Sequence, residues 1–286
     1  MKNKRIKIVM TIVGIVMTFF TTLTVVFAWK VFTDSASSLT LQVTKIDSEI
    51  HLYQAIDDNY NGVPNLLSRY SESKINEIKS NYPQDKNEYY KEKYAFNYIG
   101  YKYAISQEPS YEDILKYDFG QIYPTQIKTL KFSAVNKSDG TNYISFSFNE
   151  KEYDSISKLN ILKCMSVRVG RVINVDNNIN SDNINIEFLD KVYFNDFIDS
   201  KFNSFDVLKE EDAYEIKGSI NKNPAINDDV VDLWFQFEFE DYDSLIKHSN
   251  ESNAKPFNLT DSVYQSLQGE EIDLPNLKLK LEVRVN

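Results

Sequence analysis

The strongest constraint on this sequence is the alternation of apolar and polar residues along most of its length. In the two clearest runs, 231–239 and 277–285, nearly every second residue is apolar. A period of two places successive side chains on opposite faces of an extended chain, so each run predicts a β-strand with one buried face. The outward positions are mostly acidic in the first run and mostly basic in the second. We therefore predict that the two strands are neighbours, with opposite charges facing each other across the ladder.

The same alternation recurs in shorter runs between turn-rich breaks. These runs lie at 39–43, 46–52, 130–134, 144–148, 165–169, 184–188 and 214–216. A loop containing Asp139-Gly140, which favours hairpin turns, joins 130–134 to 144–148, so these two runs predict a β-hairpin. No alternation of strands with helices is present. The pattern favours an all-β fold, an antiparallel two-sheet sandwich of the jelly-roll type.

Helical spacing interrupts the strand pattern in one tyrosine-rich region. Within 65–106, four tyrosines recur at intervals of four, four and three: Tyr90, Tyr94, Tyr98 and Tyr101. This spacing predicts a small helical insertion. Exposed, these tyrosines would form a surface that binds sugars or partner proteins; alternatively, they pack the insertion onto the sandwich. Short helices are also predicted at 111–117 and at 263–267, the latter capped by Thr260 or Ser262.

The N-terminal region has the features of an export signal. Residues 8–29 carry no charge, and they follow four basic residues: Lys2, Lys4, Arg5 and Lys7. As a helix the run would span roughly 30 Å, so 1–28 is predicted to be a signal peptide or a membrane anchor. Cleavage is expected between Ala28 and Trp29. In both cases the basic flank places the domain 29–286 outside the cytoplasm, secreted or at the cell surface.

Composition excludes several classes of function. The chain has 42 acidic and 32 basic residues, a net charge of -10, which argues against nucleic acid as a partner. Its single cysteine, Cys164, forms no intramolecular disulfide and lies in a patterned stretch that predicts burial. The two histidines, His51 and His248, are far apart in sequence and are predicted to lie at the surface. Neither a zinc-peptidase motif nor a serine-nucleophile motif is present, so we predict no enzymatic activity and no cofactor.

One loop has a spacing of oxygen-bearing side chains that suits a cation. Asp57, Asn59 and Asn61 stand at alternate positions before Gly62, as in a calcium-binding loop. Position twelve of such a loop would be Ser68, however, where a glutamate is expected. We therefore favour a plain Asn-Gly turn and keep Ca²⁺ binding as the alternative.

Two short strings resemble the TasA/camelysin family of Gram-positive surface proteins. They are Phe-Ala-Trp-Lys-Val-Phe-Thr-Asp at 27–34, and Phe-Gly-Gln-Ile-Tyr-Pro at 119–124 followed by the strand and turn at 130–138. The resemblance implies a jelly roll, export through a dedicated signal peptidase and a structural role in an extracellular, biofilm-like matrix. In some members one subunit donates its N-terminal strand to the next, which would make the run of Leu39, Leu41 and Val43 the donor here.

Three functions follow from these observations. The first is a non-enzymatic structural or assembly protein whose partners are further copies of itself or other matrix proteins. The second is an adhesin or a module that binds carbohydrate or protein through the tyrosine-rich region. The third is a camelysin-like secreted peptidase, which would need metal ligands that the sequence does not display.

Overall fold

The computed structural model describes residues 17, 46–82, 93–115, 117–138, 140–148, 156–175, 184–198, 205–208, 214–216, 230–273 and 277–283. The chain divides into two compact units, Met1–Val43 and Thr44–Asn286. The predicted leader, the bond between Ala28 and Trp29 and the strand at 39–43 lie outside the described residues. None of the described helices is long and apolar enough to cross a bilayer.

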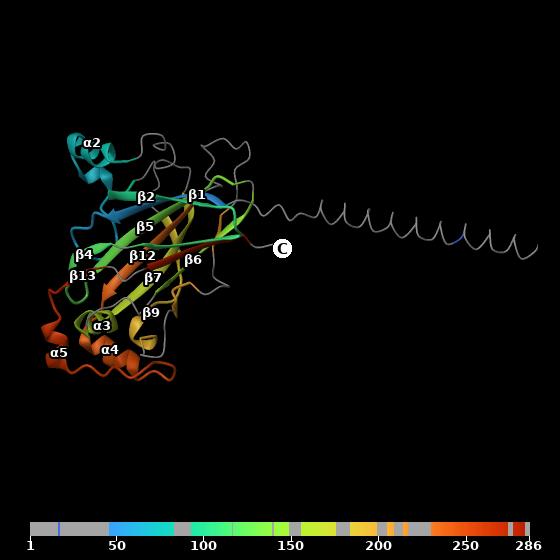
Figure 1. Ribbon diagram of the computed structural model, residues 1–286. Coiled ribbons are helices and arrows are strands. Elements are labelled where there is room, and N and C mark those ends of the chain that lie inside the picture. The colour runs from blue at the N-terminus through green and yellow to red at the C-terminus, as the bar shows by residue number, and fades with distance from the viewer. Residues whose placement is uncertain are drawn as a thin grey trace, which may run out of the picture. The chain divides into compact units, whose positions relative to one another are not determined.

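The second unit is an all-β sandwich of two large antiparallel sheets (Figure 1). The first sheet has the order β2 (Phe96–Ser106), β1 (Ile46–Ala55), β5 (Ile127–Asn136), β12 (Val230–Phe239), β7 (Met165–Val175) and β8 (Ile184–Phe188), with β9 (Val192–Tyr193) also paired to β7. The second has the order β10 (Phe205–Asp206), β6 (Asn142–Phe148), β14 (Leu277–Val283) and β3 (Ser110–Leu115), with β11 (Tyr214–Ile216) also paired to β6. A small two-stranded sheet pairs β13 (Glu271–Asp273) with β4 (Asp118–Gln121).

Helices lie at two ends of the larger sheet. A 3-10 turn, η1 (Leu67–Arg69), and α2 (Glu72–Ser80) lie near β2, whereas α3 (Ile156–Lys163), α4 (Tyr242–Ser249) and α5 (Asp261–Ser266) gather at the other end (Figure 1). A second 3-10 turn, η4 (Phe194–Asp196), follows β9. The structure confirms the predicted sandwich with a small helical insertion.

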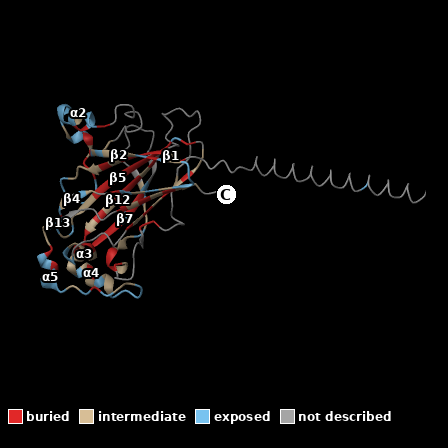
Figure 2. Cartoon of the chain, viewed as in Figure 1, coloured by how far each residue is buried: buried red, intermediate tan, exposed pale blue. Residues whose placement is uncertain are grey.

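Aromatic rings from both large sheets fill the space between them. Phe132 of β5, Phe146 of β6 and Phe235 of β12 contact one another with ring centroids 4.7 to 5.1 Å apart. All three are almost fully buried, and buried residues concentrate along β5, β12 and β7 (Figure 2). Aromatic pairs at such distances gain about 0.5–1.5 kcal/mol per pair beyond their burial. This cluster joins the two sheets.

The hairpin predicted from 130–134 and 144–148 is wrong. β5 lies in the first sheet and β6 in the second, so the loop between them carries the chain across the sandwich. Buried amide groups stabilise this crossing: Asn136 accepts hydrogen bonds from Ser138 N at 2.9 Å and from Asn142 Nδ2 at 3.1 Å. Both strands direct every second, apolar residue into one core. Strands on facing sheets meet this requirement as well as strands that lie side by side in one sheet.

The predicted pairing of the two clearest strands is also wrong. β12 lies between β5 and β7, while β14 lies between β6 and β3 in the other sheet. Their charges instead find partners on nearer strands and loops. Lys278 pairs with Glu112 at 2.7 Å, and Glu238 pairs with Lys191 at 2.6 Å. Opposite charge on two amphipathic strands is therefore not enough to make them neighbours.

Several predicted helices are strands. The stretch carrying Tyr98 and Tyr101 is β2, and the predicted helix at 111–117 falls largely on β3. Within the tyrosine-rich insertion the described helical segments are η1 and α2. The helix predicted at 263–267 is confirmed as α5, and Thr260 Oγ1 accepts a hydrogen bond from Val263 N at 3.4 Å.

Candidate functional site

The outer face of the larger sheet, which points away from the sandwich core, gathers three of the residues singled out in the sequence: His51, Tyr98 and Tyr101. Directly opposite residues in an antiparallel ladder share one face. Along β1 the register places Glu49 opposite Tyr103, His51 opposite Tyr101, and Tyr53 opposite both Tyr98 and Lys131. We call this set, with Ile105, the outer-face cluster.

A β-bulge determines which tyrosines join this cluster. The register of β2 against β1 shifts between Leu52 and Tyr53, and Gly100 in the bulge has φ 155°. Residues three apart on a regular strand point to opposite faces, but the extra residue turns Tyr98 and Tyr101 to the same side. Their ring centroids lie 6.1 and 5.9 Å from that of His51. The interval of three that predicts a helical turn therefore arises from a bulge.

The ionisable residues that β1 contributes to the outer-face cluster are buried and paired. Glu49 and His51 are only 1% and 2% exposed, so the prediction of a water-facing side of β1 and a surface His51 is wrong. Glu49 forms an ion pair with Lys137 Nζ, and its Oε2 lies 3.4 Å from His51 Nε2. Nδ1 of His51 lies 3.3 Å from the hydroxyl of Tyr98. Burial of a carboxylate is tolerable because these partners replace the water that it loses.

A buried lysine extends the cluster toward β12. Lys131 Nζ lies 5.0 Å from the ring centre of Tyr53, 5.4 Å from that of Phe96 and 3.9 Å from Asp232 Oδ1. Burial lowers the pKa of Lys131 below its ordinary value, and Asp232 partly opposes this effect. Asp232 also accepts a hydrogen bond from Ser133. The aromatic rings and the carboxylate together hold an ammonium group away from water.

Three residues of the outer-face cluster form an exposed, largely apolar row. Tyr101, Tyr103 and Ile105 are 54%, 51% and 53% exposed, and the two tyrosine rings meet edge to face at 5.0 Å. These residues stand on β2, which pairs with β1 on one side. Within the described part of the chain no strand pairs with its other side. An exposed apolar edge strand is a ready template for another strand.

Tyr94 lies away from this exposed row. Its ring packs edge to face on Trp234 at 5.9 Å, within a satellite core that includes Ile78 of α2 and Tyr82. The predicted alternative, in which tyrosines pack the insertion onto the sandwich, therefore describes Tyr94, whereas Tyr101 is exposed as a contact surface requires. Tyr90 lies outside the described residues.

The loop that follows β1 contains the three residues weighed as calcium ligands. Asp57 accepts hydrogen bonds from Asn59 N at 3.0 Å and Gly62 N at 2.7 Å, and Asn61 Oδ1 accepts one from Val63 N at 2.9 Å. These oxygens hold the backbone of the turn. Over the ranges that the structure describes, no group of three or more His, Cys, Asp or Glu residues is placed to bind a metal ion.

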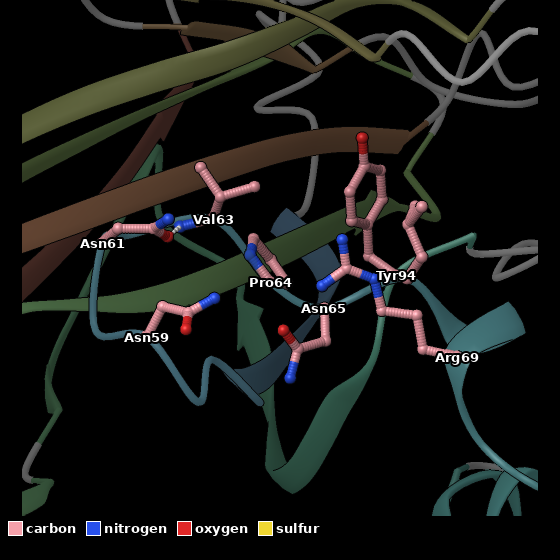
Figure 3. A pocket seen from close by; sticks show the side chains of 8 residues that line it. Asn59, Asn61, Val63, Pro64, Asn65, Arg69 and Tyr94 are labelled. Carbon is pink, nitrogen blue, oxygen red and sulfur yellow. Dashed lines mark hydrogen bonds between the residues drawn. The ribbon is translucent and has the colours of Figure 1, made fainter.

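A pocket of about 220 Å³ opens beside this loop (Figure 3). Its lining comes from the loop, from η1 with its flanking residue and from the segment before β2: Asn59, Asn61, Val63, Pro64, Asn65, Leu66, Arg69 and Tyr94. The structure thus brings two of the predicted cation ligands next to one of the predicted tyrosines. Sequence spacing gave no sign of Arg69, which lies in the 3-10 turn η1.

Cys164 and His248 have packing roles in the structure. Cys164 is fully buried, as predicted, and burial raises the pKa of its thiol to about 12. His248 is less exposed than predicted, because it stacks on Tyr193 with centroids 3.7 Å apart and its Nε2 lies 2.9 Å from Asp196. His51 and His248 therefore lie on different elements and have different partners.

No known family profile matches this chain, and no curated protein matches it. The TasA/camelysin resemblance stays a prediction from the two short strings described above.

Proposed function

We propose that this chain is a non-enzymatic structural protein of the cell exterior that assembles with further copies of itself by strand addition at β2. The observation that carries the proposal is the row of Tyr101, Tyr103 and Ile105, exposed on a strand whose second side has no described strand partner. Strand addition satisfies the backbone groups of such an edge, and side chains at alternate positions give specificity.

The occupant that we propose is the segment 39–43 of a second copy. Leu39, Leu41 and Val43 repeat every second residue and carry no charge, as does the exposed row of β2. A donor strand with this period can place one apolar side chain beside each exposed position of the acceptor. The segment precedes β1 directly in sequence. Export through the predicted leader and a role in an extracellular matrix remain part of the proposal.

A crosslinking experiment tests the pairing. Two variants of residues 29–286 are prepared, Leu41→Cys and Ile105→Cys, and are mixed under mild oxidation. The native Cys164 is buried and should stay unreactive, which gives a clean background. We expect a disulfide-linked dimer in the mixture that exceeds the dimer formed by either variant alone.

A charge variant supplies the matched control. Ile105→Lys should abolish assembly seen by light scattering and negative-stain electron microscopy, because a lysine on an edge strand opposes pairing. Ile156→Lys changes an exposed apolar residue of α3 away from this edge and should leave assembly intact. A monomer at every concentration, with no mixed crosslink, would refute the proposal and favour the alternative of a binding module that acts as a monomer.

A further inference from the structure

The asparagine-rich loop beside the pocket is held in place by the larger sheet. Gly62 adopts φ 83°, and a Cβ at this position would lie 2.7 Å from Ile127 Cγ2, so the loop can pack this closely on β5 only with glycine here. The carbonyl of Gly62 accepts hydrogen bonds from Thr129 Oγ1 at 2.8 Å and Gln236 Nε2 at 2.9 Å. Two strands of the larger sheet therefore hold the loop in place.

Several polar atoms that line the pocket accept or donate no hydrogen bond among the described residues. Asn65 is 6% exposed and uses its Nδ2 to donate to Asp58 and Tyr70, while its Oδ1 accepts no hydrogen bond from a described residue. The amide of Asn59 and the guanidinium of Arg69 likewise make no side-chain hydrogen bond or ion pair within the described part of the chain. Figure 3 shows the Arg69 side chain extending inward, with its guanidinium between Pro64 and Tyr94.

The combination of groups defines a chemical class of ligand. Arg69 is the one charged residue among those that line the pocket, and its planar guanidinium matches a carboxylate in a bidentate pair. Asn59 and Asn65 offer an amide donor and carbonyl acceptors, which suit hydroxyl groups. Val63, Pro64 and Tyr94 add apolar surface against which the C–H face of a ligand ring can pack. The volume is below the roughly 300–1,000 Å³ typical of sites for drug-sized molecules, so it suits one small unit.

We propose that this pocket binds a single carboxylate-bearing sugar unit, such as a hexuronate at the end of a polysaccharide. The carboxylate contacts Arg69, the hydroxyl groups contact Asn59 and Asn65, and the ring lies against Pro64 and Tyr94. This inference does not depend on strand addition, because the pocket residues do not belong to the exposed row of β2.

Saturation-transfer NMR and calorimetry with residues 29–286 test the proposal, with glucuronate, glucose and acetate as probes. This protein keeps the whole compact unit that begins at Thr44. We expect glucuronate to bind at least tenfold more tightly than glucose. Arg69→Gln should lower glucuronate affinity at least tenfold with no change in melting temperature, because Arg69 is exposed and unpaired within the described residues.

Lys79→Gln is the matched control, since Lys79 is an exposed cation of α2 outside the pocket. It should leave glucuronate binding unchanged. Asn59→Ala should weaken glucuronate and glucose alike, because it removes hydroxyl contacts only. Absence of glucuronate binding, binding that survives Arg69→Gln, or equal affinity for acetate and glucuronate would each overturn the proposal.

Discussion

Replacing Phe146 by leucine should weaken the contact between the two sheets by an amount that can be estimated. Phe146 is 1% exposed, and its ring lies 5.1 Å from that of Phe132 and 4.7 Å from that of Phe235. Each ring pair contributes about 0.5–1.5 kcal/mol beyond burial, so losing both costs about 1–3 kcal/mol. A domain of this size loses about 2–4 °C of melting temperature per kcal/mol. Phe146→Leu should therefore melt roughly 2–12 °C lower.

A double-mutant cycle measured by urea unfolding isolates the contact across the sheets. Phe132→Leu combined with Phe146→Leu should give a coupling energy of about 0.5–1.5 kcal/mol, because the two single changes remove the same ring pair. Phe239 lies on β12 and has no ring contact with Phe146 among the described pairs, so Phe239→Leu with Phe146→Leu should be additive within about 0.5 kcal/mol. A coupling near zero for the first pair, or an equal coupling for the control, would refute the assignment of β5 and β6 to facing sheets.

Two further predictions concern single side chains. Asp241 caps α4 by accepting hydrogen bonds from Ser244 Oγ at 2.7 Å and Ser244 N at 2.9 Å, which hold the pKa of this carboxyl below its usual range. Because the folded pKa is lower than the unfolded one, this stabilisation is present above about pH 4 and is lost as pH falls further. Asp241→Ala should lower the free energy of unfolding by about 1 kcal/mol at pH 7 and by less at pH 3. An equal loss at both pH values in urea unfolding would contradict this. Cys164, whose thiol pKa is raised to about 12 by burial, should react with iodoacetamide only in the unfolded protein, so labelling of the native protein at pH 8, detected by mass spectrometry, would contradict the burial.

The fold class could be predicted because alternation of apolar residues records which face of each strand is buried. Phe235 and Leu279 follow that rule, and both are fully buried. Which strands pair is a different matter, because alternation says nothing about the neighbour. β12 and β14 have complementary charges, yet each has other neighbours, and the choice depends on packing between segments far apart in sequence.

The candidate site was harder to predict, since its residues are assembled by long-range pairing. Glu49, His51 and Lys131 have the alternation of a water-facing row, and only the contacts on the outer face of the sheet make them buried. The tyrosines of β2 led to a wrong helix prediction for a local reason. The bulge at Gly100 places Tyr98 and Tyr101, three residues apart, on the same face of a strand. A glycine within a strand is a recognised sign of a bulge and could have indicated this one.

The position of β14 has a consequence for how the chain is made. This strand lies between β6 and β3, both of which precede it by more than a hundred residues. A nascent chain therefore cannot complete the smaller sheet until β14 has left the ribosome. Until then β3 has no ladder partner among the described strands and β6 pairs only with the short β10 and β11, and unpaired strand edges aggregate readily. Folding of the smaller sheet should thus start from its C-terminal strand and be slow, because each of its pairings with β14 joins segments far apart in sequence.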